Sequence, residues 1–207
     1  MIILDANIIK GTSLRSSVAD MLRAIRAAGV ERVGTPWIAV EEVAAQQVLA
    51  YQAKHDAARA AVDELHKATP WDHVAHPKRW QDEHVREHWR ERYASITEVL
   101  ETSPAVYQQA LYRETNLIEP CKTVNSGKHK TGARDAAIWL TAVEYARDHP
   151  EETVYFVSND TDHSSDGKLP EPMQRDIAGM EDESSWTPRR PARWFWRRLE
   201  HPPSAIG

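Results

Sequence analysis

A carboxylate inside an apolar run constrains this 207-residue chain more than any other feature. In "MIILDANII", Met1–Leu4 and Ile8–Ile9 look like a strand with both faces covered, as in a parallel sheet. An ionised Asp5 inside such a strand is unfavourable unless it is paired, hydrogen-bonded or bound to a cation. At the strand's carboxyl end it would point into the crevice where open α/β sheets bind ligands.

The remaining patterns predict alternating strands and helices. "SLRSSVADMLRAIRAAGV" has helical spacing, and "ERVGTPW" is a short strand that runs into a helix start. Thr35 is the expected N-cap of that helix, Pro36 its first residue, and Ala-rich sequence sustains it to about Thr69. A clear late strand, Val154–Val157, follows further along. This order predicts an α/β fold.

Two segments differ from this pattern. Residues 71–118 are rich in His, Arg, Glu and Trp, and they predict a helical insertion with two helices broken at Ser103-Pro104. Residues 186–207 form a tail rich in Arg and Trp, which would either anchor on the core or stack on single-stranded nucleic acid. We therefore expect one domain over residues 1–185, which includes the insertion, followed by this tail.

Composition limits the class of protein. Hydrophobic residues make up 41% and charged residues 28%, which is typical of a globular protein, and the formal net charge is −5. No apolar run approaches the roughly 20 residues of a membrane helix, and the first residues lack the pattern of a signal peptide. Cys121 is the single cysteine, which excludes an internal disulfide and any multi-cysteine zinc site. These features predict a cytoplasmic protein without a membrane partner.

Acidic residues fall at strand ends and helix starts, which share one edge of a parallel α/β sheet. They are Asp5, Glu41, Glu42, Asp135, Asp160 and Asp162. Carboxylates gathered in one crevice repel each other, and a hard divalent cation removes that repulsion. All-oxygen ligation suits Mg²⁺ or Mn²⁺.

Four stretches in order, "IILDANII", "TPWIAVEEVA", "GARDAAIWLTA" and "VYFVSNDTDH", make the chain resemble the PIN domain. This is a nuclease fold found in toxin–antitoxin ribonucleases and RNA-processing enzymes. The stretches cover roughly residues 1–50 and 128–163. The resemblance implies a three-layer α/β/α sandwich with a central parallel sheet. His163 in place of Phe, Ala6 in place of Thr, and the long insertion depart from the family pattern.

The resemblance also implies the site residues. The metal ligands would be Asp5, Glu42, Asp135 and Asp160, with Asp162 as an added or outer ligand. Asn7 would orient Asp5 through its amide, and Ser158 would bond to a ligand or a phosphate. Glu42 is preferred over Glu41 because of its spacing from Pro36.

The leading hypothesis is a Mg²⁺- or Mn²⁺-dependent endoribonuclease in which metal-activated water attacks phosphorus. Lys128, Lys130 and Arg134, next to Asp135, would either contact RNA phosphates or solvate a loop. A role as the toxin of a toxin–antitoxin pair stays open, with an antitoxin or a second copy of the chain as partner.

Two alternatives come from other classes. One is a catalytically weak PIN-like nucleic-acid-binding or regulatory module that acts through a protein partner. The other is a zinc protease, because "HVREH" over His84–His88 matches the spacing of inverted zinc proteases. We interpret "HVREH" instead as a solvated helix face with charge pairs.

Overall fold

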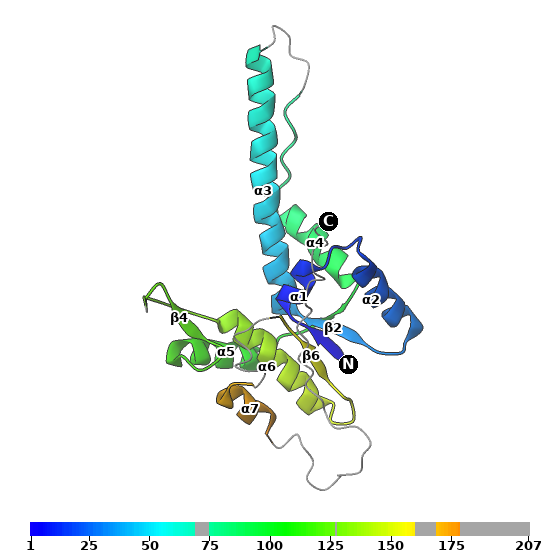
Figure 1. Ribbon diagram of the computed structural model, residues 1–207, viewed down its shortest axis with the longest axis vertical. Helices are drawn as coiled ribbons and strands as arrows, with labels where there is room; N and C mark the ends of the chain where they lie inside the picture. The colour runs from blue at the N-terminus through cyan, green and yellow to red at the C-terminus, as the bar shows by residue number, and fades with distance from the viewer. Residues whose placement is uncertain (69–74, 127, 160–168, 179–207) are drawn as a thin grey trace, which may run out of the picture.

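A parallel sheet forms the centre of the computed structural model, which describes residues 1–68, 75–126, 128–159 and 169–178 (Figure 1). Its strand order is β3-β2-β1-β6, and β4 and β5 form a separate antiparallel hairpin. The strands are β1 (Ile2–Leu4), β2 (Val33–Pro36), β3 (Glu98–Leu100), β4 (Lys122–Val124), β5 (His129–Thr131) and β6 (Tyr155–Val157). The helices are α1 (Ala6–Gly11), α2 (Ser17–Ala28), α3 (Trp37–Ala68), α4 (Asp82–Ala94), α5 (Pro104–Asn116), α6 (Ala133–Asp148) and α7 (Glu171–Ile177).

Helices flank this sheet, with α2 to one side of the strands and α5 and α6 to the other (Figure 1). The predicted α/β/α sandwich is therefore confirmed. From β1 the chain builds β2 and then β3 on one side, and it returns to place β6 on the other side of β1. The strand order thus reverses between β1 and β6, and ligands of open α/β sheets bind outside the carboxyl ends of the strands at such a point.

The first strand is shorter than its sequence suggests. β1 ends at Leu4, and Asp5 is the N-cap of α1, where its side chain accepts a hydrogen bond from the Ala6 N–H. Ile8 and Ile9 are therefore helical, and the expectation that they extend the strand is wrong. A capping aspartate satisfies an N–H that a helix leaves unpaired, which lets the chain turn at once.

The start of α3 also differs from the prediction. Thr35 and Pro36 belong to β2, where they pair with Val99 and Leu100, and α3 begins at Trp37. Thr35 is buried and its hydroxyl has no hydrogen-bond partner within the described residues, so it does not cap the helix. Pro36 is tolerated as the last strand residue because the helix follows without a loop.

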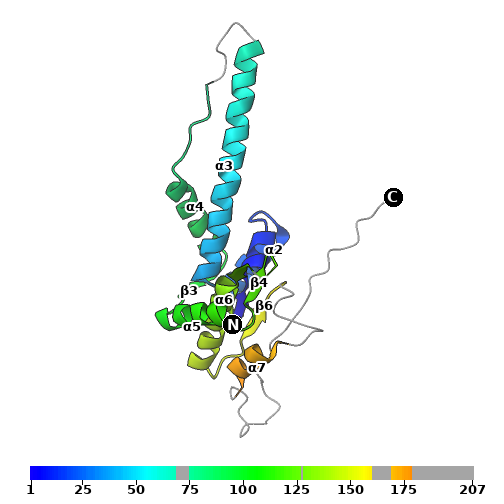
Figure 2. The ribbon, with the colours of Figure 1, turned by 90° about the vertical axis from the view of Figure 1, so that its left-hand side faces the viewer.

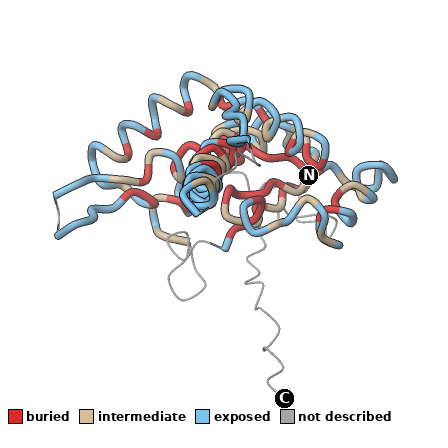
Figure 3. The backbone as a smooth tube through the Cα atoms, turned by 90° about the horizontal axis from the view of Figure 1, so that it is seen from above, coloured by how far each residue is buried: buried red, intermediate tan, exposed pale blue. Residues whose placement is uncertain are grey.

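The long helix α3 is the most conspicuous feature outside the sheet. Its 32 residues span about 48 Å, and its carboxyl half projects beyond the α/β body (Figures 1 and 2). Residues 75–81 run back along it toward α4. Buried residues gather in the strands and the helix faces toward them, whereas the projecting part of α3 is mostly exposed (Figure 3).

The stretch 71–118 contains more than helices. α4 and α5 are present, and α5 begins as expected, with Ser103 as N-cap accepting from the Val106 N–H and Pro104 at its first position. Between them, however, β3 pairs in parallel with β2 and forms an edge of the central sheet. This part of the chain is therefore built into the sandwich rather than only placed beside it.

Helix α6 supplies the largest side chain of the core. Trp139 is fully buried and meets the ring of Phe156 edge-on, with ring centroids 5.6 Å apart. Its indole N–H donates to Asp176 of α7 at 2.7 Å, and buried Arg113 of α5 also pairs with Asp176. These contacts fasten α7 against α5 and α6.

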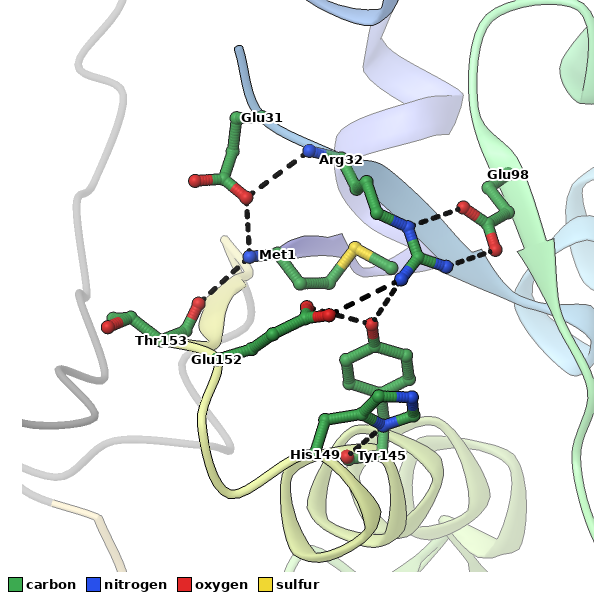
Figure 4. A network of polar contacts seen from close by, with 8 residues as sticks. All are labelled: Met1, Glu31, Arg32, Glu98, Tyr145, His149, Glu152 and Thr153. Carbon is green, nitrogen blue, oxygen red and sulfur yellow. Dashed lines mark hydrogen bonds and ion pairs between the residues drawn. The ribbon is translucent and has the colours of Figure 1, made fainter. Parts of the chain in front are cut away.

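Opposite charges meet at the edge where the strands begin (Figure 4). The Arg32 guanidinium donates two hydrogen bonds to Glu98, at 2.7 and 3.2 Å, and one to the Tyr145 hydroxyl at 2.9 Å. Tyr145 in turn donates to Glu152 at 2.9 Å. The Met1 ammonium is buried and pairs with Glu31 at 2.5 Å. We call this set the amino-edge network.

None of the helices in the described ranges is both long and apolar enough to cross a membrane. The predicted tail, residues 186–207, lies outside the described residues.

Candidate functional site

A cleft of about 140 Å³ opens at the edge of the sheet where the strands end. Three carboxylates from different parts of the chain line it: Asp5 after β1, Glu42 in the second turn of α3, and Asp135 in the first turn of α6. Asn7, Lys10 and Gln46 complete the polar lining. Like charges therefore converge at the carboxyl edge, next to the point where the strand order reverses.

Asp5 is the most buried of these carboxylates, with 3% of its surface exposed. Oδ1 accepts from the Ala6 N–H at 2.5 Å, and Oδ2 accepts from the Asn7 amide at 2.8 Å and from the Ser158 hydroxyl. Hydrogen bonds from several donors favour the ionised form of a carboxyl group and fix its orientation. The protein thus fixes the orientation of the Asp5 carboxyl group in the lining of the cleft.

Asn7 connects the two strand ends that meet at the reversal of strand order. Its amide N–H donates to Asp5 at 2.8 Å and to the Ser158 hydroxyl at 3.1 Å, while its carbonyl oxygen accepts from the Asn159 N–H at 3.0 Å. The predicted contact of Asn7 with Asp5 is present. Ser158, which was expected to bond a ligand or phosphate, lies 97% buried and donates a hydrogen bond to Asp5.

The neighbouring residues Glu41 and Glu42 have different surroundings, although 16% of each side chain is exposed. Glu42 faces the cleft, accepts from Gln46 at 3.1 Å and lies 3.7 Å from the Arg134 guanidinium. Glu41 accepts from Arg90 of α4 at 2.5 and 2.8 Å, and this hydrogen bonding raises the pKa of Arg90. The preference for Glu42 over Glu41 agrees with this arrangement.

Asp135 reaches the cleft because of the turn that precedes α6. Gly132 is the N-cap of α6, with φ of 117°. A Cβ atom at Gly132 would lie 2.7 Å from the Cα of Cys121, so only glycine fits. The amino end of a helix favours negative charge, which suits an aspartate in the first turn of α6.

Basic residues near the cleft have mixed roles. Arg134 is 62% exposed and lies closest to Glu42, while Lys130 donates to the Thr115 carbonyl at 2.5 Å and so holds β5 against α5. Lys128 is exposed in the turn between β4 and β5. Sequence reasoning missed Lys10, on the last turn of α1, and Gln46. Gln46 could have been found, because it follows Glu42 by four residues and shares its helix face.

The cleft contains the type of donor atom that a hard divalent cation prefers. All three carboxylates and the amide oxygens of Asn7 and Gln46 are oxygen ligands, the set that Mg²⁺ and Mn²⁺ prefer. Within the described ranges, no three His, Cys, Asp or Glu side chains stand close enough together to hold a metal ion. The predicted ligands Asp160 and Asp162 lie outside the described residues.

The "HVREH" segment lies on α4, away from this cleft. His84 stacks on Trp80, with ring centroids 4.8 Å apart, and His88 meets Trp89 edge-on at 6.0 Å. No third His, Cys, Asp or Glu comes near enough to complete a metal site with them in the described part of the chain. Ion pairs of Glu83 with Arg86 and Arg90 follow the same helix, as the interpretation of a solvated face predicts.

Comparison with known proteins gives one family. The family model for the PIN domain matches residues 2–163, most of the chain. Neither the curated proteins nor the solved structures contain a match.

Proposed function

The chain belongs to the PIN domain family, whose members are generally nucleases, and we propose that it is a metal-dependent endoribonuclease. The observation that carries the proposal is the cleft, where Asp5, Glu42 and Asp135 converge at the carboxyl edge of the sheet. Lys10 in the lining and Arg134 beside Glu42 offset part of the repulsion among these groups. A divalent cation that also binds a phosphodiester would offset more of it.

Asp5, Glu42 and Asp135 do not by themselves form a metal-binding group in the described residues. In this proposal they would hold Mg²⁺ or Mn²⁺ together with Asp160, and with Asp162 as an outer ligand. Such a cation supplies a nucleophile at neutral pH and stabilises the charge that develops on the leaving oxygen. No side chain needs to act as nucleophile.

Other residues of the cleft orient Asp5 and would bind the substrate. Asn7 and Ser158 keep Asp5 oriented through the hydrogen bonds of its Oδ2. Lys10 lines the same cleft, and Arg134 lies at its rim beside Glu42. In this proposal both cations contact backbone phosphates of the substrate, which would orient a strand without reading its sequence.

The proposal includes the division of the chain and its partners. Residues 1–185 act as the nuclease domain, which includes the stretch 71–118 with its sheet strand β3, and residues 186–207 form a tail. The substrate is RNA, and the protein works in the cytoplasm. Regulation by an antitoxin, or by pairing with a second copy, would fit a toxin of this family.

The products of cleavage test the proposed chemistry. Unstructured RNA incubated with Mn²⁺ or Mg²⁺ should give fragments with 5′-phosphate and 3′-hydroxyl ends, and a chelator should stop the reaction. Hydrolysis by water gives these ends, whereas attack by the RNA 2′-hydroxyl gives a 2′,3′-cyclic phosphate. Cleavage that persists in chelator, or cyclic phosphate ends, would contradict the proposal.

The adjacent glutamates of α3 provide a matched pair of variants. Glu42→Gln should reduce the cleavage rate by about 100-fold or more, because it removes a charge that binds the cation. Glu41→Gln removes the same charge one residue away, where the partner is Arg90, and should keep nearly full activity. Equal losses in both variants would show that the cleft is not the site.

A further inference from the structure

A second, larger hollow lies between α3 and α4, about 560 Å³ in volume. Aromatic and basic side chains from three segments line it: Tyr51 and Lys54 of α3, Trp80 from the segment before α4, and His84, His88 and Trp89 of α4. We call it the aromatic groove. Neither the carboxylates of the cleft nor the proposed chemistry involves any of these residues.

The aromatic groove is held in shape by contacts with α3. The backbone N–H of Trp80 donates to the Tyr51 hydroxyl at 2.7 Å, and the His55 ring contacts the Pro77 carbonyl at 3.1 Å. Trp80 is nevertheless 49% exposed, with His84 stacked on its ring and the Lys78 ammonium over the ring, 5.0 Å from its centroid. A pair of stacked rings is thus held at the surface by the Trp80 backbone, with a cation over it.

The charges of the aromatic groove favour an anionic occupant. Lys54 is its one formally charged lining residue, and no carboxylate lines it. The acidic groups at the start of α4 point to other partners, since Asp82 accepts from Gln52 and Glu83 pairs with Arg86 and Arg90. Aromatic rings beside cations and without carboxylates are the combination that binds single-stranded nucleic acid.

The aromatic groove follows the cleft along the same helix. Glu42 and Gln46 line the cleft, and the next residue, Gln47, already lines the aromatic groove together with Ala50 and Tyr51. At 1.5 Å per residue, Glu42 and Tyr51 are separated by about 14 Å along the axis of α3. A short single-stranded segment can therefore reach from the cleft to the aromatic groove.

We propose that the aromatic groove binds unpaired bases of the RNA strand whose phosphodiester lies in the cleft. Bases stack against the Trp80–His84 ring pair and its aromatic neighbours, and Lys54 neutralises a phosphate of the same segment. The inference rests on the proposed function for the identity of the ligand. It makes α3 and α4 the part of the protein that extends the substrate site beyond the reacting bond.

Binding without divalent cation tests the aromatic groove apart from catalysis. With a labelled, unstructured 12-nucleotide RNA in chelator, Trp80→Ala should weaken binding at least fivefold, since stacking contributes about 1–3 kcal/mol per base. Trp80→Phe should restore most of the affinity. Tyr112→Ala, which removes an equally exposed ring on α5, should bind as the wild type does. An abasic strand of the same length should bind the wild type and Trp80→Ala equally.

Two substrates of different size separate this inference from the proposed function. Trp80→Ala should raise KM for the 12-nucleotide RNA in Mn²⁺ and leave hydrolysis of bis(4-nitrophenyl) phosphate, too small to reach the aromatic groove, unchanged. If metal-dependent hydrolysis persists but Trp80→Ala leaves RNA binding and KM unchanged, the inference is overturned. It is also overturned if Trp80→Ala binds RNA normally but loses self-association in sedimentation, because the aromatic groove would then be an interface between copies. Loss of hydrolysis in the wild type would instead contradict the proposed function.

Discussion

The two edges of the central sheet use charge in opposite ways. At the amino edge, Arg32 is surrounded by acceptors and Glu98 meets it with both oxygens (Figure 4). At the carboxyl edge, three carboxylates share one cleft of about 140 Å³. Paired charges at half-exposed positions add a little stability, whereas gathered like charges reduce it and suit the binding of a cation. Substitutions at the amino edge should therefore change stability, and those at the carboxyl edge should change activity.

Asp5→Asn should have the largest effect on activity, and it tests the difference between the two edges of the sheet most directly. We expect RNA cleavage to fall by about 100-fold or more, because a carboxyl group that would bind the cation is replaced by an amide of nearly the same shape. Arg32→Gln, at the opposite edge, should leave the rate unchanged and lower the free energy of unfolding by about 1 kcal/mol or less. Cleavage rates and urea denaturation of both variants measure this. A similar loss of activity in both would remove the distinction between the edges.

Asn7→Ala should have the next largest effect. The amide joins Asp5, Ser158 and Asn159, so its loss leaves Asp5 less well oriented without removing any charge. Loss of such supporting contacts lowers metal affinity or activity by about 10–100-fold. The Mn²⁺ concentration that gives half-maximal rate should rise. Asn116→Ala, whose amide bonds only within α5 in the described residues, is the control and should show no such shift.

Gly132→Ala tests how the carboxyl edge is built. The new Cβ would lie 2.7 Å from the Cys121 Cα, and φ of 117° is unfavourable for alanine. We expect a loss of about 1–3 kcal/mol in the free energy of unfolding, measured by urea denaturation. Gly11→Ala introduces the same methyl group where nothing lies within 4 Å and φ is not positive. If Gly11→Ala were the more damaging of the two, this account of the turn before α6 would be wrong.

Substitution of Tyr145 should have the smallest effect, a change in how stability depends on pH, and it tests the hydrogen bonding at the amino edge. Burial, followed by the hydrogen bond to Glu152, raises the pKa of Tyr145 to about 12. The unfolded chain loses this proton near pH 10 and the folded protein near pH 12, so the stabilisation present below pH 10 is lost between those values. Thermal unfolding at several pH values should therefore show a smaller decline over this window in Tyr145→Phe than in the wild type. Parallel declines would contradict the pKa shift.

The carboxyl edge was largely predictable from the sequence. Buried strands must be apolar, so a polar residue directly after such a run marks a strand end, and Asp5 and Ser158 are found there. Glu42 and Asp135 were placed through their position near helix starts. The pattern could not show that Asp5 also caps α1, because Ile8 and Ile9 are buried in a helix as they would be in a strand.

Three strands with little burial were also missed by the sequence reasoning. β3 has one buried residue, Leu100, in a region rich in charge, so no apolar run marks it as part of the sheet. β4 and β5 are almost wholly exposed and lack the alternation that indicates a strand. The aromatic groove was hidden for another reason. Its residues come from segments about 30 positions apart, and only their packing brings Tyr51 next to Trp80.

Mn²⁺ binding to the folded protein tests the central claim, that the carboxyl-edge cleft is a cation site, most directly. A ligand at about 100 times its Kd adds about 2.7 kcal/mol to the free energy of unfolding, which corresponds to about 5–10 °C in Tm for a chain of this size. The wild type and Glu41→Gln should both show this rise in Mn²⁺ and lose it in chelator. Asp5→Asn should show none. An unchanged Tm in the wild type, or an equal rise in Asp5→Asn, would contradict the account.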